Sequence, residues 1–196
     1  MLADKLSPFH VILASGSPRR QQLLGDMGIS FTLLSNAVDE SYPPNLMGEA
    51  IPAYLAKKKA AALLKQLKVN DILITADTVV WHKDTSLEKP ANQNEARAML
   101  SALSGDWHEV ITAVCITYQG KHRIISDNTR VKFASLTAEE IDFYIERYKP
   151  YDKAGSYGIQ EWLGLIGIEE ISGSYTNVVG LPTQKLYKTL RAMVIA

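Results

Sequence analysis

Strand signals and helix signals alternate along this chain, and that alternation limits the fold more than any other feature of the sequence. Short apolar runs predict strands at 11–14, 31–34, 72–81, 109–118, 121–134 and 163–171. Capped or amphipathic segments predict helices at about 19–27, 49–68, 92–105, 137–149 and 182–194. The Gln119-Gly120 pair indicates an antiparallel hairpin between two of the strands. We therefore expect an α/β fold with a mixed sheet.

Length and charge narrow the class of protein. The 196 residues suffice for one sizeable core, so one domain spanning 1–196 is expected. Lys and Arg total 21, as do Asp and Glu, so no bulk field favours nucleic acid or an acidic membrane as a partner. No apolar stretch approaches the ~20 residues of a membrane span, and 1–10 has no signal-peptide core. We expect a cytoplasmic enzyme or binding protein.

Cys115 is the single cysteine, which excludes an internal disulfide framework and a cysteine zinc site. It lies in an apolar run between Val114 and Ile116, so a buried structural thiol is expected rather than a nucleophile.

The segment 11–20 (VILASGSPRR) reads as a buried strand, a tight turn and a helix start. Ser17 suits the N-cap, and Pro18 suits the first helical position. Arg19 and Arg20 then fall in the first helical turn, where backbone N–H groups already carry partial positive charge. A bound phosphate would relieve this conflict. The alternative is that both arginines point into solvent.

The second predicted helix places one lysine against its pattern. Its apolar face is formed by Leu55, Ala56, Ala60, Leu63, Leu64 and Leu67, whereas Lys57, Lys58, Lys65 and Lys68 occupy the opposite, solvated face. Lys59 projects inward between Leu55 and Leu63. An inward lysine needs a carboxylate, a phosphate or a route to water. It therefore either reaches an anion in a cleft or extends to solvent from the edge of the stripe.

Carboxylates occur at two places where chemistry is plausible. Asp77 interrupts an apolar strand and needs a partner, a metal or a cleft; a bulge or turn is the plainer interpretation. Asp39-Glu40 follows the strand at 31–34 and could supply a hard oxygen ligand for Mg²⁺, although such pairs are also common on solvated loops. Lys89 precedes Pro90 and is either an exposed loop lysine or part of the same site.

A glycine-containing loop could complete a recognition site, and several familiar motifs are missing from the sequence. The segment 152–160 contains two glycines, and its Gln160 offers a donor and an acceptor to a base edge. The sequence has no Walker loop, no G-x-G-x-x-G turn, no nucleophile elbow and no histidine pair with metal-ligand spacing. Basic residues, carboxylates, hydroxyls and one amide remain, which matches metal-assisted hydrolysis of a phosphoanhydride.

Taken together, these motifs resemble the Maf family of nucleoside triphosphate pyrophosphatases. The matching segments run nearly from end to end: 14–20 (ASGSPRR), 39–40 (DE), 55–60 (LAKKKA), 76–78 (ADT), 88–90 (EKP), 152–155 (DKAG), 158–160 (GIQ) and 179–182 (VGLP). Each motif is modest alone, but their order and spacing are specific.

The resemblance implies an inosine-triphosphatase-like fold: an elongated mixed β-sheet with flanking helices and a cleft between two lobes. It implies hydrolysis between the α- and β-phosphates with a divalent cation, Mg²⁺ or Mn²⁺, in a homodimer. It also implies a housecleaning role in which dTTP and UTP, or modified pyrimidine nucleotides, are converted to the monophosphate and pyrophosphate.

Residue by residue, the resemblance carries over as follows. Asp77 matches the catalytic proton acceptor, and Glu40 matches a carboxylate that holds the metal with help from Asp77. The positions that match the phosphate site are Ser15, Ser17, Arg20, Lys59 and Lys89. Base preference is expected at Arg19, Thr78 and Gln160, a combination similar to that of the branch acting on dTTP and UTP. The branch acting on 7-methyl-GTP has Trp, Gln and Glu there.

Two other functions compete with hydrolysis. A nucleotidyltransferase would use the same metal and phosphate site but would need an acceptor. A nucleotide-binding regulator of cell division would bind tightly with little turnover. The inward Lys59 and the strand-embedded Asp77 favour chemistry, because simple binding does not need a carboxylate beside phosphates. Two questions stay open at this point: whether Asp77 is mainly base or metal ligand, and whether Arg19 touches the base or shapes its pocket.

Overall fold

The computed structural model describes residues 1–34 and 38–193. Within them a seven-stranded sheet has the order β2-β1-β3-β5-β6-β7, with β4 paired to β3. The strands are β1 (His10–Leu13), β2 (Thr32–Leu33), β3 (Asp71–His82), β4 (Thr85–Leu87), β5 (Trp107–Tyr118), β6 (Lys121–Phe133) and β7 (Ile168–Ser172). β1 runs parallel to β2 and β3, and the other pairs are antiparallel. The expected mixed sheet is confirmed.

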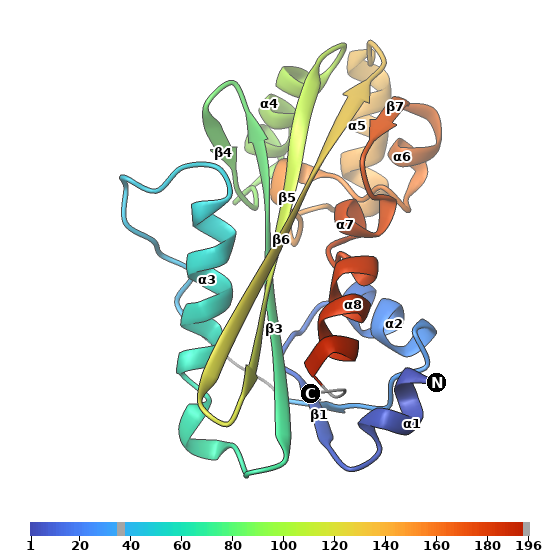
Figure 1. Cartoon of the computed structure of the whole chain (residues 1–196). Coiled ribbons are helices and arrows are strands. Elements are labelled where there is room, and N and C mark those ends of the chain that lie inside the picture. Colours follow the sequence, from blue (N-terminus) through green and yellow to red (C-terminus); the bar gives the residue numbers. More distant parts are fainter. Residues whose placement is uncertain (35–37, 194–196) are drawn as a thin grey trace.

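Helices cover both faces of this sheet (Figure 1). They are α1 (Leu2–Leu6), α2 (Pro18–Asp26), α3 (Ala50–Ala61), α4 (Gln93–Leu103), α5 (Ala138–Tyr148), α6 (Trp162–Ile166), α7 (Tyr175–Val179) and α8 (Thr183–Met193), with 3₁₀ turns η1 (Leu64–Gln66) and η2 (Ala154–Ser156). α3 lies along one face. On the other side, α1, α2 and α8 form a lower lobe, and α4, α5 and α6 form an upper lobe. None of the helices within 1–34 and 38–193 has the length and apolar character to cross a membrane.

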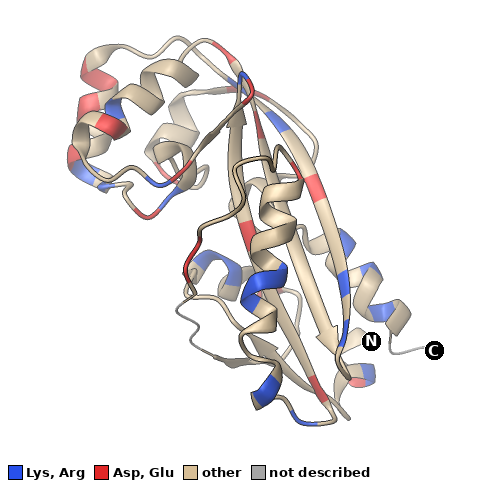
Figure 2. Cartoon of the chain, turned by 90° about the vertical axis from the view of Figure 1, so that its left-hand side faces the viewer, with Lys and Arg blue, Asp and Glu red and all other residues tan. Residues whose placement is uncertain are grey.

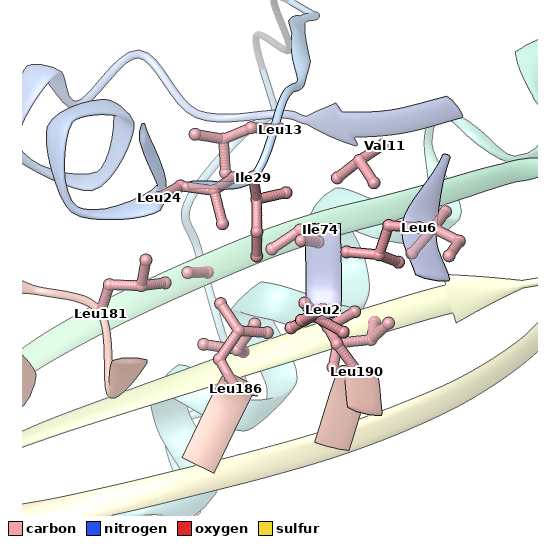
Figure 3. Packing of buried hydrophobic residues seen from close by; sticks show 14 residues of the cluster. Leu2, Leu6, Val11, Leu13, Leu24, Ile29, Ile74, Leu181, Leu186 and Leu190 are labelled. Carbon is pink, nitrogen blue, oxygen red and sulfur yellow. The ribbon is translucent and has the colours of Figure 1, made fainter. Parts of the chain in front are cut away.

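The long strands β3, β5 and β6 run through both lobes (Figure 1), and their alternating side chains serve separate cores. Along β5, Val110 packs in the upper lobe and Val114 in the lower lobe, whereas Cys115 faces α3. The expected buried thiol is confirmed. In the lower lobe, leucines from three helices, including Leu24 and Leu190, pack on β3 (Figure 3). Each such fully buried leucine contributes about 2 kcal/mol.

The feature of the sheet that positions the site is a gap in the pairing of β3. β1 pairs with β3 only over Asp71–Ile74, and β4 pairs only from Val80 onward. In the described part of the chain, residues 75–79 are therefore paired with β5 alone. The ladder with β1 ends where the Ala14 N–H donates to the Ile74 carbonyl (2.9 Å), and the chain then turns into α2. This open stretch of strand edge lies between the two lobes.

Two of the predicted helices begin at the capping residues that the sequence indicated. The Asn92 side chain accepts a hydrogen bond from the Glu95 N–H (3.0 Å) at the start of α4. At the start of α5, Thr137 accepts from the Glu140 N–H, and Glu140 accepts from the Thr137 N–H. Such reciprocal bonds satisfy two N–H groups that the helix itself cannot satisfy.

Two predicted elements differ from the structure. The helix expected at 49–68 ends at Ala61, and the 3₁₀ turn that follows leaves Leu64 exposed. The strand expected at 163–171 is wrong in its first half, because Trp162–Ile166 forms α6 and only Ile168–Ser172 is strand. A short apolar run does not distinguish a buried helical turn from a strand. The short elements α1, β4 and α7 were not predicted.

Candidate active site

A cavity of about 370 Å³ opens at the gap in β3. Its lining comes from the β1–α2 loop, α3 and β3, and from the segments that precede α6 and α8. The lining includes nine of the expected site residues: Ser15, Ser17, Arg19, Arg20, Glu40, Lys59, Asp77, Thr78 and Lys89. Gln160 is exposed and does not line the cavity, although its neighbours Gly158 and Ile159 do. Because both lobes contribute, the expected cleft between two lobes is confirmed.

One side of the cavity, which we call the α3 wall, consists of Glu40, Lys59, Asp77 and Lys89. The ammonium of Lys59 lies 2.6 Å from Asp77 Oδ1 and 2.8 Å from Glu40 Oε1. Lys89 Nζ lies 2.6 Å from Glu40 Oε2. The inward position of Lys59 on its helix therefore brings it to carboxylates in a cleft. Basic residues gather toward the end of α3, the helix that faces the viewer in Figure 2.

The two carboxyl groups of the α3 wall have opposite pKa shifts. Burial opposes ionisation of Glu40, but hydrogen bonds and charges from Lys59 and Lys89 outweigh it and lower the pKa to about 2. For Asp77, burial is the larger effect, so its pKa is raised although Lys59 and Arg20 favour the ionised form. A raised pKa makes Asp77 the better proton acceptor of the two.

Arg20 is held by the protein itself. Its Nε donates to the Gly180 carbonyl (2.8 Å), and its Nη1 donates to Ala76 O (3.1 Å) and Ser15 Oγ (3.4 Å). Its Nη2 donates to Thr78 Oγ1 (2.9 Å). These bonds use four of the five N–H groups of the guanidinium. Arg20 thus satisfies the unpaired edge of β3 at Ala76 and joins it to the turn before α8.

The partly buried Thr78 hydroxyl is hydrogen-bonded to the buried Thr112 hydroxyl. Thr112 Oγ1 donates to the Asn177 carbonyl (3.0 Å), so its single hydrogen is used there. The hydrogen of the 2.9 Å bond between Thr78 and Thr112 therefore comes from Thr78. Since Thr78 also accepts from Arg20, its hydroxyl orientation is fixed by the protein.

The start of α2 confirms the sequence prediction. Ser17 is the N-cap and Pro18 occupies the first turn. The Ser17 side chain makes no cap bond; instead its N–H donates to Ser15 Oγ (3.2 Å). Arg19 turns toward the opposite lobe, where Nη1 lies 3.6 Å from Asp152 Oδ2. The two arginines therefore point to different partners.

A second side of the cavity is lined by Asp152, Lys153 and Gly158. We call these residues, together with Tyr144 and Glu161, which contact them from behind the lining, the upper wall. Lys153 is only 8% exposed and lies 2.7 Å from Asp152 Oδ1 and 3.0 Å from Glu161 Oε1. Sequence reasoning quoted the DKAG motif but assigned Lys153 no role. A lysine next to an aspartate in a glycine-containing loop was the available signal.

Across 1–34 and 38–193, no group of three His, Cys, Asp or Glu side chains converges in a way that could hold a metal ion. Two of the three carboxylates that line the cavity, Glu40 and Asp77, form a pair that shares the Lys59 ammonium. A pair of this kind can bind a cation when another molecule supplies further oxygen ligands.

The family model described as Maf-like protein matches residues 10–193. The chain belongs to this family. The chain is 48% identical over 194 residues to a dTTP/UTP pyrophosphatase of Flavobacterium johnsoniae. The alignment covers 99% of this chain and 100% of the relative. The chain is also 49% identical over 193 residues to a dTTP/UTP pyrophosphatase of Phocaeicola vulgatus, with 98% and 100% covered.

Two solved structures are similar to this Maf-like protein in outline. One is a nucleoside-triphosphatase / dITP/XTP pyrophosphatase of Mycobacterium abscessus, with a TM-score of 0.43, 14% identity, and 95% of this chain and 94% of that chain covered. The other is the Ham1 protein of Staphylococcus aureus, with a TM-score of 0.48, 12% identity, and 94% and 99% covered.

Proposed function

We propose that this protein hydrolyses dTTP and UTP to the nucleoside monophosphate and pyrophosphate. The observation that carries the proposal is the α3 wall, where Asp77 and Glu40 share Lys59 inside a cavity lined by further cations. The relatives that match over nearly their whole length, and that are named for this reaction, support the choice of substrates.

The charge of the cavity suits a metal-bound triphosphate. Its lining carries five cationic side chains (Arg19, Arg20, Lys59, Lys89 and Lys153) and three carboxylates (Glu40, Asp77 and Asp152), a surplus of two positive charges. A nucleoside triphosphate has roughly four negative charges at neutral pH, and one divalent cation reduces them to about two. The lining therefore complements the complex better than it complements the free nucleotide.

Glu40 and Asp77 would hold the divalent cation, Mg²⁺ or Mn²⁺. Their oxygen donors fit it, because Mg²⁺ is commonly bound by one or two carboxylates, with water and substrate phosphates as the remaining ligands. When bound, the cation supplies charge stabilisation at the phosphate oxygens.

The side chains of the α3 wall divide the remaining work. Asp77 orients the attacking water and accepts its proton, a role that its raised pKa supports. Lys59 and Lys89 neutralise the negative charge that develops on the departing pyrophosphate, as they exchange carboxylate contacts for phosphate contacts. The start of α2 offers further N–H groups to the phosphates.

Product analysis tests the proposal. The purified protein is incubated with Mg²⁺ or Mn²⁺ and with dTTP, UTP, CTP, GTP, ITP or 7-methyl-GTP, and pyrophosphate is measured against orthophosphate. We expect pyrophosphate without an added acceptor, and fastest turnover of dTTP and UTP. Orthophosphate as the first product would exclude this reaction, and a preference for 7-methyl-GTP would exclude this substrate class.

The homodimer stays a prediction from the family resemblance, and the cytoplasmic location stays a prediction from the sequence. Sedimentation of the purified protein checks the first, and fractionation of cells checks the second. The housecleaning role predicts that modified pyrimidine nucleotides are hydrolysed at least as fast as dTTP.

A further inference from the structure

Building on the proposed function, we propose that the upper wall is a positioning network through which Arg19 governs the choice of base. Arg19 does so without touching the base: it holds Asp152, and the network passes that restraint to the segment 158–160. Lys153, Glu161 and Tyr144 are then positioning residues for base selection, a role that the site motifs do not give them.

The network is a continuous series of contacts that starts in the lower lobe and ends in the upper one. Arg19, on α2, contacts Asp152 at 3.6 Å, and Asp152 contacts Lys153 at 2.7 Å. Lys153 contacts Glu161 at 3.0 Å, and the Tyr144 hydroxyl donates to the other carboxylate oxygen of Glu161. Cation and anion alternate along the series.

A backbone bond closes the series at the cavity. The Gly158 N–H donates to the Tyr144 hydroxyl (3.0 Å), so the tyrosine joins Glu161 to the main chain of the segment that lines the cavity. The Glu161 N–H donates to the Gly158 carbonyl (3.0 Å) and forms a tight turn. Gln160 lies within this turn. The hydrogen bond between Gly158 and Glu161 therefore restrains its backbone, although its side chain is exposed.

Burial increases toward the inner end of the network. The side chains of Arg19 and Asp152 are 30% and 62% exposed, whereas those of Lys153 and Glu161 are 8% and 25% exposed, and Tyr144 is fully buried. Removing one partner of a buried ion pair leaves an uncompensated charge. Lys153, Glu161 and Tyr144 therefore keep one arrangement, whereas the more exposed pair of Arg19 and Asp152 can move when a ligand occupies the cleft.

The packing around Gly158 shows how little freedom the segment has. A Cβ at position 158 would lie 2.8 Å from Cδ of Glu161. That carboxylate cannot move aside, because Lys153 and Tyr144 hold its two oxygens. Nearby, Gly155 has a φ of +67°, and a Cβ there would lie 2.9 Å from Val80 of β3. The segment is therefore seated on the sheet and locked by Glu161.

The role of Arg19 follows from this geometry. The ion-pair contact of Arg19 in the structure is Asp152, at the outer end of the network, whereas Arg20 contacts β3 at Ala76 and Thr78. A base is discriminated by polar groups held in a fixed position, since each misplaced hydrogen bond weakens selection. Arg19 therefore shapes the pocket that reads the base.

Glu161→Gln is the main test, with Tyr144→Phe as a milder variant that keeps the ring in the core. We expect the ratio of kcat/KM for UTP over CTP to fall about tenfold in each, mainly through KM for UTP, with kcat changed by less than about threefold. Asp142→Asn is the matched control. Asp142 lies on the same helix as Tyr144, but its ion pair with Arg97 of α4 (2.6 Å) is outside the network, so we expect the ratio to stay unchanged.

A double-mutant cycle tests the role of Arg19. If Arg19 acts through Asp152, then Arg19→Gln, Asp152→Asn and the double variant lower the UTP/CTP ratio by similar factors. Independent factors that multiply in the double variant would overturn the inference, because Arg19 would then act on the base directly. An unchanged ratio in both Glu161→Gln and Tyr144→Phe would overturn it as well.

The same ratios are measured as dissociation constants with α,β-imido analogues of UTP and CTP. Wild-type protein that binds these analogues selectively but releases no pyrophosphate would contradict the proposed function and leave the network to be judged on binding. Wild-type turnover with unchanged ratios in the variants would contradict the network alone.

Discussion

The two walls of the cavity contain the same kinds of charge but differ in how they are held. In the α3 wall, only Lys59 and Asp77 are largely buried, whereas Glu40 and Lys89 are 44% and 51% exposed and come from separate loops. In the upper wall, Lys153 and Glu161 are largely buried and closed by a tyrosine hydroxyl. The difference teaches that exposed ion pairs can exchange a partner for a substrate at low cost, whereas buried ones keep their geometry.

The largest expected effect is on activity in the α3 wall. Asp77→Asn removes the proton acceptor, so we expect kcat to fall by about 10³-fold or more. The free energy of unfolding is expected to stay within about 1 kcal/mol, because burial already disfavours the ionised carboxylate. Pyrophosphate release and thermal unfolding measure the two effects.

Asp71→Asn is the matched control on the same strand. Asp71 is also buried, but it accepts a hydrogen bond from the Lys68 N–H (2.7 Å) outside the cavity, and its pKa is lowered despite its burial. We expect lost stability of about 1–2 kcal/mol with kcat retained. Near-normal activity of Asp77→Asn would remove the distinction between the two aspartates.

The next effect concerns the core behind the upper wall. His108 is buried, and its Nε2 lies 2.7 Å from the hydroxyl of Tyr157, which lines the cavity. Burial, with a smaller contribution from His82, lowers the pKa of His108 to about 3, and the charge of Asp106 only partly opposes this. His108 is thus neutral in the folded protein at pH values where the unfolded chain binds a proton.

The sign of the pH dependence follows. The free energy of unfolding has its full value, as far as His108 is concerned, above about pH 6.5. It decreases as the pH falls toward 3, and by pH 4 it is lower by about 3 kcal/mol. Urea unfolding at a series of pH values measures it. His108→Gln should flatten the curve over this window, and an equal slope in that variant would show that other groups cause it.

Arg20 should affect stability more than its place in a polar cavity suggests. Arg20→Lys loses the planar donors that reach Gly180, Ala76 and Thr78, so we expect a loss of about 2 kcal/mol. Arg97→Lys is the control, because Arg97 makes a half-exposed ion pair, and it should cost under about 0.5 kcal/mol. Equal losses would mean that Arg20 does not tie the edge of β3.

The smallest effect lies away from both walls. Thr137→Ala removes the cap of α5, and we expect a loss of about 1 kcal/mol. The UTP/CTP ratio should stay unchanged, because the network depends on Tyr144 at the middle of α5 rather than on its first turn. A changed ratio would show that base selection responds to general loosening of the upper lobe, which would weaken the contrast between the walls.

Local signals in the sequence predicted much of the scaffold. Ser17 and Pro18 indicated the start of α2, and Asn92 and Thr137 indicated the starts of α4 and α5. The helical period of α3 predicted that Lys59 points inward. These features depend on residues a few positions apart, so a sequence displays them directly. Asp77 was recognisable because an aspartate in an apolar strand needs a partner.

Other parts of the site depend on distances that no local pattern contains. The gap in β3 exists because β1 ends at Leu13 and β4 begins to pair only at Val80, so it follows from the lengths of two other strands. The role of Lys153 depends on Tyr144 and Glu161, which meet only when α5 packs beside the following loop. Strand and helix were confused at α6 because a five-residue apolar segment fits either.

The strands that pass through both lobes have a thermodynamic consequence. β5 contributes Val110 to one core and Val114 to the other, and it pairs with β6 along its whole length and with β3 from Glu109 to Tyr118. If either lobe unfolded, the ends of the shared strands in that lobe would lose their packing. We therefore expect amide protons in both halves of β5 to exchange with similar protection, as parts of one cooperative unit. The cleft then lies within a single folding transition, so substrate that stabilises one lobe stabilises the other.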